Sequence, residues 1–469
     1  MINNQTINIC IPIEVDDYLK EFIFKNINYR RKVWNDFVEE AKKFEGKNFM
    51  YDGFKPLKFK TEYFKIEDEE DIYNEMCVGI SEQVSKNMLV AVNRVRDENL
   101  SNPKGKRHKI QFHGFDQYYG SFKVNNKPSI TNSKDKNISN RIHIKDKYTL
   151  TFRVRGCDVG KGSRYKKEIL TIHLKEPLFK YIGIGDYYPS FIREYKVKGE
   201  NAVECWFNEL DIKETCFIHK LGKFYIQLSI TVSYKIKDKD IRSRQLRAGI
   251  DTGIHNPCMI YLGKGYFKDI RMPDKISIKI HYLERRARRL QHIMDRKRKI
   301  NEERVKRGEL KSIYTNNYKK IRYKYRKVWA KIVNIKRNWI YNECKKIVTN
   351  YQIICVDRFR QPGQDDGRFK SLPSKVKRHI NYANRFHCMY TFNEILKHMA
   401  IKYGCTYIDS PPSTTCTCSF CGTSYEANTD DLRIRKFACN NKDCTMFGIL
   451  FDRDRNAARN CYKYIKKYL

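Results

Sequence analysis

The spacing of hydrophobic residues predicts that the first half of the chain mixes helices with strands. Apolar residues between 18 and 38 recur at intervals of three and four, which predicts an amphipathic helix, and a second helical pattern covers about 71–96. From 105 to 245 the pattern alternates instead, as it does over 148–155, which is typical of strands. The apolar segment at 7–13 is expected to join these strands.

The second half has a different order of elements. It begins with a short strand that ends at Asp251 and closes with a helix that follows Phe451. Between them the pattern predicts strands at 258–262 and 266–270, a helical hairpin at 277–350, a strand at 352–357, a helix at 371–403 and a strand at 406–409. No internal repeat is present.

The helical hairpin at 277–350 is almost free of Gly and Pro and dense in Arg and Lys. Gly308 marks the break between its two arms. The first arm has an expected apolar stripe made of Leu283, Leu290, Ile293 and Ile300. A run of charges is most often a solvated face, but acidic residues are sparse here, which favours a binding surface. Interleaved Tyr and Arg, such as Tyr314, Tyr318 and Arg322, suit either base stacking or helix packing.

Composition narrows the class of partner. The 469 residues include 94 Lys and Arg against 54 Asp and Glu, a net charge of +40. Such an excess repels itself unless a polyanion is the usual partner, so nucleic acid is the first candidate. No stretch approaches the roughly 18–20 apolar residues of a membrane-spanning helix. The start lacks the pattern of a signal peptide, and a cytoplasmic location without membrane contact is expected.

Four cysteines stand in two short pairs near the end of the chain. Cys418 and Cys421 are separated by 17 residues from Cys439 and Cys444. Two such pairs are the signature of a zinc ribbon, in which each pair turns two thiolates toward one point. Four sulfur ligands leave no open coordination position, so the zinc would be structural. Cys416 is a spare candidate.

Three carboxylates occupy the ends of predicted elements. Asp251 ends the first strand of the second half, Asp357 ends a later apolar strand, and Asp454 starts the final helix, with Asp452 as the alternative. A lone Asp after a strand is usually a turn residue or a cap. The order of all three matches an RNase H-like nuclease, where such carboxylates hold two Mg²⁺ ions about 4 Å apart for phosphodiester hydrolysis.

The same segments resemble a known family. Gly249-Ile-Asp-Thr-Gly, the basic hairpin, Ile354-Cys-Val-Asp, the Cys418-Ser-Phe-Cys-Gly knuckle and Asp452-Arg-Asp-Arg-Asn-Ala-Ala together look like the RuvC half of the TnpB family, which includes miniature type V-F CRISPR effectors. The resemblance covers about 245–469 and is weaker before that. It implies an RNA-guided, Mg²⁺-dependent DNA endonuclease whose partners are a guide RNA and target DNA.

The resemblance also implies a fold class and a division into domains. The class is α+β multidomain: an N-terminal β-barrel (wedge) with a helical recognition lobe, then an RNase H-like (RuvC) α/β domain with an inserted zinc ribbon. The expected bounds are 1–20 and 105–245 for the wedge, 21–104 for the recognition lobe, 246–412 and 451–469 for the nuclease domain, and 413–450 for the ribbon. Effectors of this kind can also dimerise on one guide RNA.

Two other functions stay open. The family usually has Glu where this chain has Asp357, and a shorter carboxylate must reach further to its metal. One alternative is therefore an RNA-guided DNA-binding repressor with a weakened nuclease site. The other is a transposition accessory protein, for which the ribbon and the basic hairpin suffice. Transposon and CRISPR contexts are not distinguished by the sequence.

Overall fold

The computed structural model divides the chain into two compact units, Ile2–Lys235 and Ile236–Leu469. Each unit is described by itself. The structure describes residues 2–46, 49–54, 72–101, 107–113, 119–125, 142–145, 148–154, 169–178, 211–235, 243–253, 258–357, 373–411, 414–424 and 436–468. Both units mix helices and strands, which confirms the α and β content expected from the sequence.

The N-terminal unit contains two antiparallel sheets. The first has the order β1-β7-β6-β2, formed by β1 (Ile2–Pro12), β2 (Tyr119–Asn125), β6 (Asp211–Lys220) and β7 (Lys223–Lys235). The second consists of β3 (Ile142–Ile144), β4 (Thr149–Arg153) and β5 (Ile169–His173). The N-terminal strand therefore pairs with β7 along its whole length. Closure of these sheets into a barrel stays a prediction.

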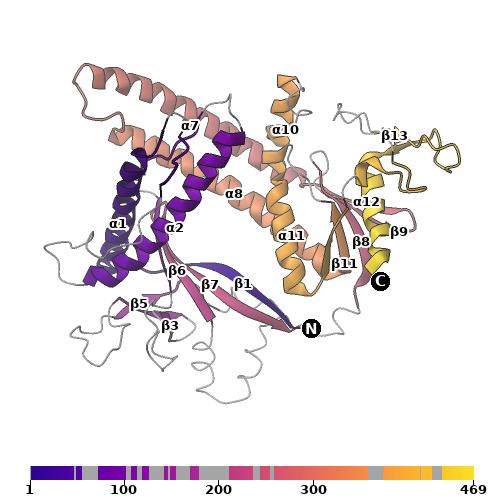
Figure 1. Cartoon of the computed structure of the whole chain (residues 1–469), viewed down its shortest axis with the longest axis horizontal. Coiled ribbons are helices and arrows are strands. Elements are labelled where there is room, and N and C mark those ends of the chain that lie inside the picture. The colour runs from indigo at the N-terminus through magenta and orange to yellow at the C-terminus, as the bar shows by residue number, and fades with distance from the viewer. Residues whose placement is uncertain are drawn as a thin grey trace, which may run out of the picture. The chain divides into compact units, whose positions relative to one another are not determined.

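Two helices, α1 (Asp17–Lys42) and α2 (Ile72–Ser101), lie side by side in this unit (Figure 1). Asp16 caps α1 by accepting a hydrogen bond from the Leu19 amide at 2.7 Å. Phe22 on α1 meets Phe122, Phe152 and Phe217 edge-on, with ring centroids 6.0 to 6.3 Å apart. Since these three rings come from β2, β4 and β6, the helix and both sheets share one aromatic core.

The C-terminal unit is built on a five-stranded sheet of order β10-β9-β8-β11-β12. Its strands are β8 (Gln245–Asp251), β9 (Cys258–Gly263), β10 (Tyr266–Ile270), β11 (Tyr351–Asp357) and β12 (Thr406–Asp409). Strands β8, β9 and β10 are antiparallel neighbours, whereas β8, β11 and β12 run parallel. Every strand expected in this half is present.

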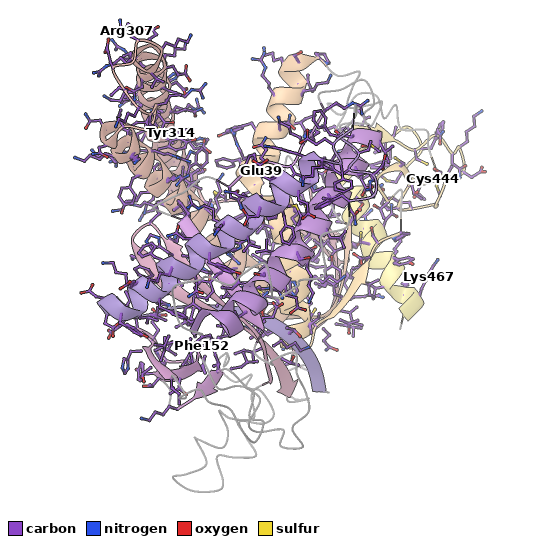
Figure 2. The ribbon with its side chains drawn as sticks, turned by 60° about the vertical axis from the view of Figure 1, so that its left-hand side comes forward. Glu39, Phe152, Arg307, Tyr314, Cys444 and Lys467 are labelled. Atoms are coloured by element: carbon purple, nitrogen blue, oxygen red, sulfur yellow. The ribbon has the colours of Figure 1, made fainter. Side chains whose placement is uncertain are left out.

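The basic hairpin consists of α7 (Asp274–Lys306) and α8 (Asn316–Asn350), which run side by side (Figure 1). Figure 2 shows Arg307 and Tyr314 at its far end and side chains projecting outward along both arms. Gly308 adopts the positive φ of 77° that the turn requires. Asn301 is buried there and donates to the Ile313 carbonyl at 2.7 Å, which ties the end of α7 to the start of α8.

The predicted apolar stripe on α7 is wrong in its outer part. Leu283 is buried, but Ile293 and Ile300 are 44% and 46% exposed. Two helices in contact bury only the narrow line of side chains between them, and periodicity alone does not show where that line runs.

The single helix expected over 371–403 is also incorrect, because the chain forms α10 (Ser374–His387) and α11 (Met389–Tyr403). Cys388 separates them in a left-handed conformation with φ of 54°. The Cys388 thiol donates to the Arg385 carbonyl at 3.3 Å, and no Gly or Pro marks the break in the sequence.

None of the described helices is long and apolar enough to cross a membrane.

Candidate functional site

The four predicted zinc ligands converge on one point. The Sγ atoms of Cys418, Cys421, Cys439 and Cys444 all lie within 4.8 Å of one another. The Cys418–Cys444 pair is separated by 3.9 Å and the Cys421–Cys439 pair by 3.6 Å. This group can hold a metal ion, and four thiolates are a set that zinc prefers. Cys416 is not part of the group.

Local backbone geometry turns the thiols inward. Gly422 has φ of 78° and its amide donates to the Cys418 carbonyl at 2.9 Å, which closes the first knuckle. The Phe420 amide points at the Cys418 sulfur and the Met446 amide at the Cys444 sulfur, at 3.5 and 3.4 Å. Hydrogen bonding with Thr423 lowers the pKa of Cys421 to about 6, whereas burial raises the pKa of Cys439 to about 12, so Cys421 is the thiol that loses its proton most readily. Residues 425–435 of the expected ribbon lie outside the described part.

Two of the predicted carboxylates lie side by side at one edge of the C-terminal sheet. Strands β8 and β11 are parallel, and Asp251 stands in register with Asp357. Partners in register on neighbouring strands point to the same face of a sheet. Thr252, the next residue, donates both its hydroxyl and its amide to the Asp357 carbonyl, at 2.8 and 3.2 Å. The ends of the two strands are thereby fixed together.

The final helix, α12 (Arg453–Tyr464), covers that face of the sheet (Figure 1). It approaches β8 so closely that a Cβ on Gly249 would lie 2.1 Å from the Ala458 carbonyl oxygen and 2.3 Å from the Tyr462 amide nitrogen. The Arg247 guanidinium lies 4.4 Å from the centre of the Tyr462 ring. Arg247 thus contacts Tyr462, whereas Gly249, later on the strand, contacts Ala458, earlier on the helix. Helix α12 therefore runs antiparallel to β8.

This direction places Asp454 next to the carboxylate edge. From the Gly249–Ala458 contact, two residues along the strand lead to Asp251, and one helical turn in the same direction leads to Asp454. Both steps are about 6 to 7 Å long, so the two carboxylates reach the same level of the sheet. Asp454 is 3% exposed and Asp251 is 6% exposed. Burial raises the pKa of Cys461 well above its usual range, and the nearby charges of Asp357 and Asp251 act in the same direction.

Asp452 has a different task. Its carboxylate accepts a hydrogen bond from the Arg455 amide at 3.0 Å and so forms the N-cap of α12. Since Asp454 is buried on the sheet side and Asp452 is occupied as a cap, the geometry favours Asp454 as the third acidic residue. Its negative charge also suits the first turn of a helix, where the macrodipole is positive.

Sequence analysis missed the polar residues that connect the two clusters. Thr414, in the short helix η2 (Thr414–Cys416), donates a hydrogen bond from its hydroxyl to Oδ2 of Asp357. Asn460 of α12 donates to the carbonyls of Thr414 and Thr417, both at 2.7 Å. Asn456 donates to Thr417 and accepts from the Ser419 amide, both at 2.8 Å. Only the Asn-Ala-Ala-Arg-Asn string hinted at this helix face.

Within the described ranges, the four thiols form a group that could hold a metal ion, and the three carboxylates do not form such a group with one another. Their chemistry nevertheless fits Mg²⁺, which takes oxygen ligands from a few carboxylates and keeps several waters. Asp251 and Asp454 are nearly fully buried, and buried charges are found paired or on metals; Arg453 Nε lies 3.9 Å from Oδ1 of Asp454. The residues present are therefore compatible with divalent cations at this edge.

A cationic and aromatic surface lies beside the acidic edge. The guanidinium of Arg459 on α12 lies 4.4 Å from the ring of Phe420 on the cysteine knuckle, and also approaches Tyr261 and Phe267. Arg455 approaches Phe267 at 5.3 Å.

On the hairpin, Tyr318 is buried, as expected for packing, whereas Tyr314 is 52% exposed. Arginine beside exposed rings suits both phosphates and bases.

Comparison with known proteins finds matches of three kinds. Residues 390–461 match the family model "Cas12f1-like, TNB domain", a segment that contains the four cysteines and Asp454. Two proteins of Acanthamoeba polyphaga mimivirus, the TnpB-like proteins L79 and L770, are each 28% identical over 146 residues. That is 31% of this chain and 26% of each relative, so the match spans about a quarter of their length.

A cryo-EM structure of a Cas12f1–sgRNA–target DNA complex is similar at a TM-score of 0.42 with 13% identity, over 95% of this chain and 83% of that chain. The matched segment of the family model includes the cysteine and Asp454 motifs on which the resemblance rests. These matches make the chain similar to Cas12f1-like and TnpB-like proteins over the matched segments.

Proposed function

We propose that this protein is an RNA-guided DNA endonuclease that cuts target DNA in a RuvC-type site formed by Asp251, Asp357 and Asp454. The observation that carries the proposal is the register of Asp251 with Asp357 on the sheet face that α12 covers, with Asp454 one turn from the Gly249 contact. The strand order β10-β9-β8-β11-β12, in which β8 pairs antiparallel with β9 and parallel with β11, supports an RNase H-like domain.

Each residue has a definable part in hydrolysis. Asp251 and Asp357 would hold the cations from the sheet, and Asp454 would contribute a further carboxylate from the helix. Two bound Mg²⁺ ions would supply a hydroxide-like nucleophile and neutralise the leaving oxygen. Thr252 keeps the two strand ends together, and α12 keeps Asp454 on the sheet. Arg455 and Arg459, on the same helix as Asp454, would supply positive charge to the phosphates of a bound strand.

The hairpin supports nucleic-acid partners. Helix α8 carries eleven Lys and Arg and one acidic residue, Glu343, which pairs with Lys346 at 2.7 Å. A guide RNA and an RNA–DNA duplex need a long positive surface that contacts the backbone. We expect the purified protein to carry RNA, with a log–log salt slope of about 0.7 to 0.9 for each phosphate contacted. Pure protein without RNA and with salt-independent binding would contradict this.

The decisive test is cleavage of a guide-matched DNA by wild type, Asp251→Ala and Asp454→Ala in Mg²⁺. Both variants should lose cutting and keep guided binding. Asp409→Ala is the matched control, because Asp409 ends the neighbouring parallel strand but stands in register with Val356, on the opposite face from Asp357. Asp409→Ala should therefore cut like wild type.

One alternative has an observation in its favour, namely the short side chain at Asp357. A wild-type protein that binds its matched target and never cuts in Mg²⁺ or Mn²⁺ would be a guided DNA-binding repressor. A protein that binds nucleic acid without any guide dependence would instead be an accessory factor. A second copy of the chain on the same RNA is tested by the mass of the complex in solution.

A further inference from the structure

Thr414 lies between the acidic edge and the cysteine knuckle. Its side chain is buried, and its hydroxyl donates to Oδ2 of Asp357 from a position 57 residues later in the chain. Its own carbonyl accepts from Asn460 on α12 at 2.7 Å. Thr414 is therefore held by the same helix that carries Asp454.

Asp357 is thus fixed at two places. Thr252 binds its main-chain carbonyl through two hydrogen bonds, and Thr414 binds one carboxylate oxygen. A hydroxyl donor on one oxygen restricts rotation of the carboxylate about its last bond, so the direction of the other oxygen is set before a cation arrives. Such outer partners orient metal ligands and raise metal affinity.

We propose that Thr414 is a positioning residue that aims the Asp357 carboxylate at a divalent cation. This inference rests on the proposed function of the acidic edge. Asp has one methylene fewer than Glu, so its carboxylate has fewer bonds about which it can adjust to a cation that tolerates little distance error. The buried Thr414 hydroxyl, by donating to Oδ2, restricts rotation of the Asp357 carboxylate. The shorter side chain can then present its other oxygen to a cation.

The test measures Mn²⁺ binding to the nucleic-acid-free, zinc-loaded full chain by electron paramagnetic resonance. Thr414→Val removes the hydroxyl and keeps the shape, and should weaken Mn²⁺ binding about 10- to 100-fold. Thr414→Ser retains the hydroxyl and should restore binding. Thr349→Val is the matched control, because that hydroxyl donates only to its own helix, at Lys345 and Lys346.

Asp357→Glu provides a second measurement that a purely structural role would not affect. The longer side chain moves the carboxylate away from the Thr414 hydroxyl, so Thr414→Val should cost little further affinity in this background. If Thr414 only supports the fold, the substitution should cost the same in both backgrounds. Zinc content and the unfolding temperature are recorded for every variant, so that loss of the fold is recognised.

The outcomes separate this inference from the proposed function. If wild type binds Mn²⁺ and Asp251→Ala does not, the result supports the acidic site. If Thr414→Val then binds Mn²⁺ more weakly and Thr414→Ser binds it normally, the result supports the positioning role. Equal binding by wild type and Thr414→Val overturns the positioning role alone. Wild type that binds no Mn²⁺ overturns the acidic site and this inference with it.

Discussion

The cysteine cluster and the acidic edge are both candidate metal sites of the C-terminal unit, yet they are assembled differently. The four thiols come from two short loops and already lie within 4.8 Å of one another. The three carboxylates come from two strands and a helix that are far apart in the chain, and in the described residues they do not form a comparably close group. A site built from local turns is formed by the spacing of its residues, whereas a site built from a sheet depends on register and on helix placement.

The largest expected effect concerns the cysteine cluster. Cys421→Ser removes one of four ligands, and because a structural zinc couples binding to folding, zinc content should fall from about one per chain to nearly none. The region from 414 to 464 should then be cut readily by proteases. Cys416→Ser, outside the cluster, should keep its zinc. Folded wild-type protein without zinc in elemental analysis would refute this prediction.

Asp454→Asn tests the acidic edge without touching the cysteines. Cutting should fall by about three orders of magnitude or more, because a ligand to the catalytic ions is replaced by a neutral group. Asp452→Ala is the comparison and should cut normally while costing about 1 kcal/mol of stability through loss of the N-cap. If the two variants exchange these phenotypes, Asp452 is the third acidic residue. Single-turnover cleavage and urea unfolding are the measurements.

Gly249→Ala should separate the two clusters. The new Cβ would meet backbone atoms of α12 at 2.1 and 2.3 Å, so the helix must move, at a cost of about 3 kcal/mol. Mn²⁺ binding should fall and zinc content should stay. The control is Gly79→Ala in α2, where the added Cβ meets only Val124 at 3.7 Å and should stabilise the helix by about 0.5 to 1 kcal/mol. An unchanged unfolding curve for Gly249→Ala would contradict the close contact.

Asn456→Ala should have the smallest effect, because it weakens the connection between the clusters and leaves both sets of ligands in place. The Thr417 carbonyl and the Ser419 amide lose a buried partner, at a cost of about 1 to 3 kcal/mol. Exposed Asn317→Ala should change stability by less than about 0.5 kcal/mol. Urea unfolding and zinc release, measured together, test this prediction. A variant that loses its zinc but unfolds at the same urea concentration as wild type would contradict it.

The sequence predicted what depends on local spacing. The Cys418 and Cys421 knuckle, the strands that end at Asp251 and Asp357, and the final helix are all found where the patterns placed them. Each of these features depends on a few consecutive residues, namely a turn glycine, an apolar run or a capping Asp.

Features that depend on long-range contacts were missed. The Thr414 contact with Asp357 joins residues far apart, and the close approach at Gly249 depends on the path of α12 across β8. The break at Cys388 was missed for a different reason, because a local hydrogen bond to Arg385 accompanies it and no Gly or Pro marks it. Ile293 is exposed because packing, not periodicity, decides which hairpin side chains are covered.

The path of α12 across β8 also has a kinetic consequence. Contacts between distant segments form late, because the entropy of closing long loops opposes them until other structure is in place. The α7–α8 hairpin and the cysteine knuckles need only short loops, whereas Gly249 must meet Ala458 across most of the unit. During refolding from urea with zinc present, we therefore expect hydrogen-exchange protection to appear first in the hairpin and the knuckles, and last in the amides where α12 docks on β8.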